Sequence, residues 1–275
     1  QDHVKPGLLF VGTEFGVFFT VNGGSNWIKL KGGSPNIAFR DLVIQKREND
    51  LVGATFGRSF YILDDYTPLR DVTNEMLKNQ VTLFPVRKTP WYVQKHLLGC
   101  GEPLCKGSQG DSYYVAPNPD FGATFTYYLP KGLKTRKDKR RETEKEAEAK
   151  NQNVRFGDLD DVIDEQREDA PAIVFTVRNS AGEVVRHIEG PAEAGFNRVA
   201  WNLRYPALDA WAPVTEEDEP EEGVGVLVAP GKFTVSMQQR VDGVLSELNQ
   251  SQSFDVVSIR EPTLPGSSQQ QRVVF

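Results

Sequence analysis

The sequence predicts a mainly β protein that is interrupted by one charged helical region. Short runs of β-branched and aromatic residues recur about every ten residues and are separated by Gly, Asn and Pro, which is typical of a β meander. A single region near the middle of the chain is instead rich in Lys, Arg, Glu and Ala and poor in apolar residues, which is typical of a solvated helix.

The composition is that of a globular chain of 275 residues, a length that suits about two domains. Hydrophobic residues make up 39%, charged residues 25% and aromatic residues 10%, which excludes a collagen-like, wholly disordered or disulfide-dense protein. No apolar run reaches the roughly 18 residues of a membrane-spanning helix, so we expect no membrane span. A net charge of −6 and a pI near 5.3 argue against nucleic acid as a partner, because phosphate backbones select clustered Lys and Arg.

Residues 1–87 are expected to form short strands joined by turns. The small residues Gly53 and Ala54 suit the crowded inner strand of a propeller blade, where backbones converge. The expected strands are Leu8–Val11, Gly16–Val21, Trp27–Leu30, Asp41–Gln45, Leu51–Thr55 and Ser59–Leu63.

Residues 88–120 contain so many Gly and Pro residues that we expect an irregular connector. It holds both cysteines, Cys100 and Cys105. A metal site would need more ligands than the nearby His96 supplies, so no metal or other cofactor is expected. A small structural disulfide, which would imply an oxidising compartment, and two free thiols both remain open, and we expect the disulfide.

Residues 131–170 are expected to be a helical insertion. Lys134–Lys150 carries balanced charges and should form a solvated helix. The acidic stretch Asp158–Glu165 resembles a calcium loop in its spaced carboxylates but lacks the glycine at the sixth position. A short amphipathic helix that buries Leu159, Val162 and Ile163 is the better interpretation.

Residues 121–260 predict a β-sandwich around this insertion, because about seven strands occur in it. Alternation of apolar and polar residues marks a half-buried strand at Phe233–Gln238, and Trp201 and Phe233 are expected in the core. A tail, 261–275, follows. The strands are Phe121–Leu129, Ile173–Arg178, Glu183–Ile188, Asn197–Asn202, Gly225–Val228, Phe233–Gln238 and Phe254–Val257.

The segment 20–27 resembles the bacterial neuraminidase repeat, or Asp-box, Ser-x-Asp-x-Gly-x-Thr-Trp. Thr20 stands at the Ser position, Asn22 at the Asp, Gly24 at the Gly and Trp27 at the Trp, while Asn26 departs from the Thr. The resemblance implies the terminal blades of a sialidase-like or sortilin-like β-propeller. An Asx side chain would accept amide protons of its own turn, and the tryptophan would fill the space between blades.

Three later segments resemble the Ig-like module found in flagellar hook-cap proteins and in secreted bacterial enzymes. They are a hairpin at Asn179–Arg186, a Gly-x-x-x-Val-x-Trp-Asn strand at Gly195–Asn202 and an Ala-Pro-Gly-x-Phe-Thr-Val strand at Ala229–Val235. The order of segments is also similar to the C-terminal portion of large bacterial exoproteins of the repeat-containing glycosyl hydrolase type. This resemblance implies an extracellular or periplasmic location and a further part of the propeller, before Gln1, as partner.

Two function classes follow from these features. The chain is expected to be a non-catalytic accessory, structural or binding segment of a secreted propeller protein, with carbohydrate or protein as ligand; Trp91, Tyr113 and Trp211 are the candidate binding aromatics.

Alternatively, the chain is part of a sialidase-like glycoside hydrolase whose active site lies mostly outside this chain. Sialidase chemistry, as the family implies, needs arginines and carboxylates at one propeller mouth, and about two blades cannot close a ring. The candidates are Arg40, Arg47, Arg58 and Arg70 with Glu14, Asp41, Asp64 and Asp65, the last two being expected as turn caps.

Overall fold

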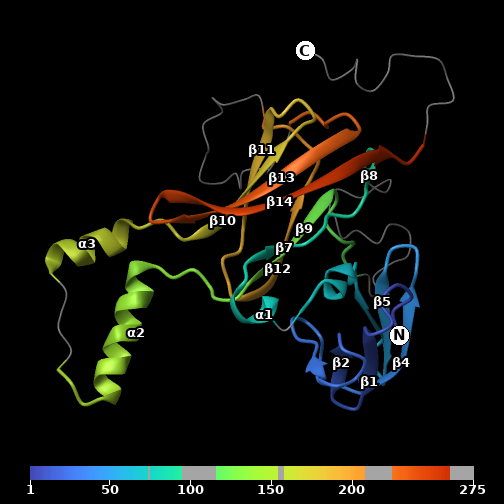
Figure 1. The fold of residues 1–275 in the computed structure, drawn as a ribbon, viewed down its shortest axis with the longest axis horizontal. Coiled ribbons are helices and arrows are strands. Elements are labelled where there is room, and N and C mark those ends of the chain that lie inside the picture. Colours follow the sequence, from blue (N-terminus) through green and yellow to red (C-terminus); the bar gives the residue numbers. More distant parts are fainter. Residues whose placement is uncertain (74, 95–115, 154–157, 208–224, 261–275) are drawn as a thin grey trace, which may run out of the picture. The chain divides into compact units, whose positions relative to one another are not determined.

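The computed structural model describes residues 1–73, 75–94, 116–153, 158–207 and 225–260 (Figure 1). Of these residues, 41% lie in strands and 14% in helices, so the protein is mainly β. The chain divides into two compact units, Gln1–Gln80 and Val81–Phe275. The first unit ends at Gln80 rather than at residue 87, because Thr82 and Leu83 pair with Tyr128 and Tyr127 of the second unit.

The first unit contains two three-stranded antiparallel sheets. The inner faces of the two sheets meet at Phe39, whose carbonyl oxygen lies 2.9 Å from where a side chain on Gly12 would begin. Each strand expected in this part of the sequence is present. The strands are β1 (Leu9–Thr13), β2 (Gly16–Thr20), β3 (Ile28–Lys29), β4 (Phe39–Gln45), β5 (Asp50–Thr55) and β6 (Phe60–Leu63); the 3-10 helix η1 (Thr67–Arg70) and α1 (Met76–Asn79) follow.

Gly53 is small for a local reason. A β-carbon at this position would lie 2.7 Å from the ring of Phe39, which is closer than real contacts allow. The crowding that the sequence suggested at this strand therefore arises from two side chains of the neighbouring strand β4, the buried Phe39 ring and Leu42.

The second unit contains a five-stranded sheet, in the order β11-β10-β13-β14-β8, and a three-stranded sheet, in the order β12-β9-β7. Pairing is antiparallel except between β8 and β14, which run parallel. The short strand β8 lies within the segment expected to be an irregular connector. The strands are β7 (Thr82–Leu83), β8 (Thr89–Trp91), β9 (Ala123–Leu129), β10 (Ala172–Arg178), β11 (Val184–Gly190), β12 (Gly195–Trp201), β13 (Gly231–Val241) and β14 (Val244–Ser258).

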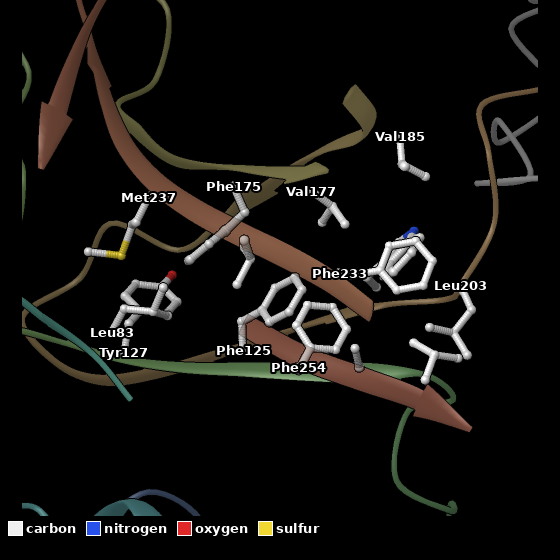
Figure 2. Packing of buried hydrophobic residues seen from close by; sticks show 14 of the residues in the cluster. Leu83, Phe125, Tyr127, Phe175, Val177, Val185, Leu203, Phe233, Met237 and Phe254 are labelled. Atoms are coloured by element: carbon white, nitrogen blue, oxygen red, sulfur yellow. The ribbon is translucent and has the colours of Figure 1, made fainter. Parts of the chain in front are cut away.

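The two sheets of this unit share one hydrophobic core (Figure 2). Alternate residues of β10 and β13 point into it, as the period of two along a strand requires. Trp201 is 1% exposed, as expected, and its ring lies edge-on to Phe233 with the ring centres 5.2 Å apart. Phe125 of the three-stranded sheet contacts Phe175 of the five-stranded sheet, with ring centres 5.6 Å apart.

Two glutamines tie the sheets together at the β14 edge. The Gln250 side chain accepts the Leu83 backbone N–H at 3.2 Å, and the Gln252 side chain donates to the Leu83 carbonyl at 3.0 Å. Both glutamines lie opposite inward-facing residues of β13, namely Met237 and Val235. The polar middle of β14 therefore belongs to the fold, although it lacks the apolar pattern of a strand.

Strand β14 begins at Val244, ten residues before the expected Phe254. Asp242 and Gly243 both have positive φ, 54° and 72°, which is the two-residue turn that joins tightly paired strands. The expected strand Gly225–Val228 is wrong, because this segment makes only an isolated bridge between Leu227 and Arg204.

The helical insertion is α2 (Arg136–Ala149) and α3 (Leu159–Arg167). Both helices begin with a capping box, in which the side chain of Thr135 or Asp158 and the side chain three residues later bond each other's backbone amides. Neither helix contains a buried residue. The expectation that α3 buries Leu159 is wrong: this side chain is 71% exposed at the first turn.

Candidate functional site

The turn 20–27 has the hydrogen bonds expected of an Asp-box. The Asn22 side-chain oxygen accepts the Asn26 amide proton at 3.0 Å and the Thr20 hydroxyl proton at 2.8 Å. The Gly24 amide donates to the Thr20 hydroxyl at 3.1 Å, and Gly24 has a φ of 102°, which favours glycine. Thr20 is fully buried. Asn22 thus takes the capping part of an aspartate in this turn.

Trp27 departs from the expected arrangement. It is 45% exposed, and its indole lies 3.8 Å from the position that a side chain on Gly24 would occupy. The ring therefore lies over its own turn and does not serve as a buried filler within this unit.

A buried carboxylate at the N-terminus joins the two ends of the first unit. The Asp2 side chain is fully buried and accepts hydrogen bonds from the Tyr66 hydroxyl at 2.6 Å and from Arg70 at 2.8 and 2.9 Å. The backbone amides of Val4 and Lys5 donate to it at 3.2 and 2.7 Å. The sequence carries no local signal for this cluster, since Asp2 is separated from its main partners by more than 60 residues.

Charge and burial in this cluster shift two pKa values. Burial alone would raise the pKa of the Asp2 carboxyl, but hydrogen bonds from Arg70, Tyr66 and the backbone outweigh it and hold that pKa well below its usual range. Burial and the bond to Asp2 raise the pKa of Tyr66 to about 12. Arg70 also donates to Asn49 at 2.7 Å and lies over the Tyr66 ring. Since each charged group is paired, the cluster of Asp2, Tyr66 and Arg70 serves a structural role, and we call it the clasp.

Four of the other sialidase-type candidates have partners close to them in the structure. Arg40 pairs with Glu14 at 3.5 Å, and Arg47 with Glu48 at 2.8 Å, in each case with both side chains exposed. Asp65 accepts both the amide and the hydroxyl of Thr67, at 3.2 and 2.6 Å, and is the turn cap expected from the sequence.

The aromatic and cysteine candidates are only partly described. Trp91 is half-buried against the core of the second unit, and its indole N–H donates to the Val228 carbonyl at 2.6 Å. This bond and packing make it part of the fold rather than a free platform. Tyr113, Trp211, Cys100 and Cys105 lie outside the described residues.

Among the described residues of the first unit, the outer face of the β4–β6 sheet is largely apolar and exposed, although Asp41, Gln45 and Asp50 lie on it as well. Val43, Val52 and Ile62 lie side by side across the three strands, and Ala54 lies beside Phe60. Val43 is 56% exposed, Ile62 59% and Phe60 69%. The opposite face of the same sheet bears Leu42, Leu51, Tyr61 and Leu63, which line a hollow of about 210 Å³ between the two sheets.

A sequence signal for this surface exists. Leu42–Ile44 and Phe60–Leu63 are continuous apolar runs, which are typical of strands buried on both faces, whereas a strand with one wet face alternates. The sheet therefore has two apolar faces, and this unit covers one of them.

In the second unit, strands β11 and β12 flank a polar cleft of about 700 Å³. Asp120, Arg186, His187 and Glu189 contribute ionisable side chains to its lining. His187 is hydrogen-bonded to Thr176 at 3.1 Å. Within the ranges that the structure describes, no group of three or more His, Cys, Asp or Glu residues could hold a metal ion, and no helix is long and apolar enough to cross a membrane.

Comparison with known proteins finds no significant match to a family description, to a curated protein or to a solved structure.

Proposed function

We propose that residues 1–80 are terminal blades of a larger β-propeller and that the second unit is an Ig-like accessory sandwich. In this proposal the chain is a non-catalytic structural or binding segment of a secreted bacterial protein. The outer face of the β4–β6 sheet is then the surface on which the adjoining part of the propeller packs.

The single observation that carries this proposal is a sheet with two apolar faces. Burial of apolar surface stabilises proteins by about 25 cal/mol per Å², and a sheet that is apolar on both faces is normally an interior layer. The blades of a propeller are such layers, because each lies between two others. The two sheets β1–β3 and β4–β6, with a turn between β2 and β3 that resembles an Asp-box, support the same interpretation.

The second unit supports the Ig-like part of the proposal through the positions of the three motifs. The Asn179–Gly182 turn joins β10 to β11, Gly195–Trp201 forms β12, and Gly231 begins β13. Each motif therefore falls on the kind of element that the resemblance implies.

The proposal can be tested by photo-crosslinking in the secreted protein that contains this chain. A benzophenone amino acid replaces Val43 on the outer face of the β4–β6 sheet. A second variant carries it at Ser251, an exposed position on the five-stranded sheet of the other unit, as a control. Peptide mass spectrometry then identifies the crosslinked residues.

We expect a crosslink within the same polypeptide, from position 43 to an apolar strand outside residues 1–80, and none from position 251. Absence of any crosslink at position 43 would overturn the proposal. A crosslink from position 43 to a separate protein molecule would also overturn it, since the face would then be an interface between chains.

A further inference from the structure

Helices α2 and α3 are held together by charged groups. Arg140 binds both oxygens of Glu165, at 2.7 and 2.9 Å, and also pairs with Glu144 at 2.6 Å. The backbone N–H of Arg136, at the start of α2, donates to Glu168 at 2.6 Å. Since neither helix buries a residue, apolar packing contributes little to this contact.

The helical pair is also joined to the sandwich by charge. The Arg136 guanidinium binds Asp242, in the turn between β13 and β14, and lies 3.3 Å from Asp164 of α3. At the base of the insertion, the Leu133 backbone N–H donates to the Ala192 carbonyl at 2.9 Å. Figure 1 shows α2 and α3 beside the outer end of the β13–β14 hairpin. A backbone hydrogen bond therefore fixes the start of the insertion at Leu133, and an ion pair fixes the helices to the β13–β14 turn.

The balance of charge makes these contacts interdependent. The guanidinium groups of Arg136 and Arg140 each pair with two carboxylates, so loss of either arginine leaves two carboxylates close together without their cation. The four acidic residues are Glu144, Asp164, Glu165 and Asp242.

We propose that the α2–α3 pair is an ionic strap, which docks on the β13–β14 turn at low ionic strength and detaches as salt concentration rises. Arg136, Asp164 and Asp242 are between 39% and 58% exposed, so dissolved ions reach them. The screening length falls from about 30 Å at 0.01 M salt to about 3 Å at 1 M. Helix α2 persists on release, because its capping box lies within the helix and most of its 14 residues are strong helix formers.

Backbone ¹⁵N relaxation of the deuterated full chain tests the strap, because it separates a helix that tumbles with the sandwich from one that moves freely. The heteronuclear NOE of α2 amides is compared with that of β10 amides as sodium chloride rises from low to high concentration. We expect the α2 values to match those of β10 at low salt and to fall well below them at high salt, with chemical shifts that remain helical.

Three variants sharpen the test. Arg136→Gln should free α2 already at low salt, because Arg136 supplies the ion pair to the β13–β14 turn. Asp242→Asn removes the partner on the turn and should have the same effect. Lys150→Gln removes the same charge from the same helix, but its partner Glu146 lies within α2, so this control should dock normally. Equal α2 and β10 values at high salt would overturn the proposal. So would free α2 at every salt concentration, loss of helical shifts on release, or an Arg136→Gln variant that behaves as the control does.

Discussion

Replacement of Asp2 by alanine should lower the free energy of unfolding of the first unit strongly, although Asp2 is only the second residue of the chain. The substitution removes a fully buried carboxylate and leaves the Arg70 guanidinium, only 17% exposed, without its anion. Removing one partner of a buried ion pair costs about 3–5 kcal/mol. We expect a loss of that size in the free energy of unfolding of residues 1–80.

Hydrogen exchange is the suitable assay, because the chain has two units that can unfold separately and exchange reports on each unit by its own amides. Amides of β2 and β5 report on the first unit, and amides of β10 report on the second and should not change. Asp41→Ala, an exposed acid on β4, is the control and should stay within about 0.5 kcal/mol of the wild type. A loss below about 1 kcal/mol for Asp2→Ala, the range of exposed pairs, would refute the clasp.

The same cluster predicts a dependence on pH. The pKa of Asp2 is depressed in the folded state relative to about 3.9 for an unfolded aspartate. Its contribution to stability is therefore complete at neutral pH and is lost progressively as pH falls below about 4 towards the folded pKa. The protection of β5 amides should weaken over this range in the wild type, and less steeply in Asp2→Ala. Parallel pH profiles for the two proteins would contradict this assignment.

Three further predictions concern the second unit. Trp201→Ala should cost about 3–5 kcal/mol by the cavity rule for aromatic core residues, measured by hydrogen exchange of β10; a tolerant variant would mean that the core is misassigned. Deleting residues 134–151 with a short Gly-Ser bridge should cost a few kcal/mol at most in the same assay, and loss of β10 protection would show that the insertion is essential to the fold. Thiol titration of the denatured, unreduced protein should find Cys100 and Cys105 bonded; two reactive thiols would count against both the disulfide and an oxidising compartment.

The strands of the first unit could be predicted because their chemistry is local. Gly and Asn residues punctuate each short apolar run, and the turn at Asn22 satisfies its own amides without help from distant residues. The Asp2 cluster could not be predicted in this way. Its carboxylate is specified by Tyr66 and Arg70, and nothing near Asp2 in the sequence marks it as buried.

The polar part of β14 shows a second limit of pattern analysis. Ser, Gln and Asn from 246 to 253 lack the apolar alternation of a strand, yet pairing with β13 and the bonds of Gln250 and Gln252 to Leu83 fix them. For α3, the pattern suggested a buried stripe, but this helix is held by charged contacts and leaves Leu159 exposed.

The chain also contains an internal control for the proposed packing surface. The middle of the β13–β14 hairpin carries hydroxyl side chains on its outer face: Ser236 lies beside Ser251, and Thr234 lies beside Ser253. The middle of the β4–β6 sheet instead carries Val43, Val52 and Ile62 side by side on its outer face, with Asp41, Gln45 and Asp50 on the same face. Because the central row of the β4–β6 face is apolar where that of the β13–β14 hairpin is polar, we infer that the β4–β6 face is selected for burial against another layer.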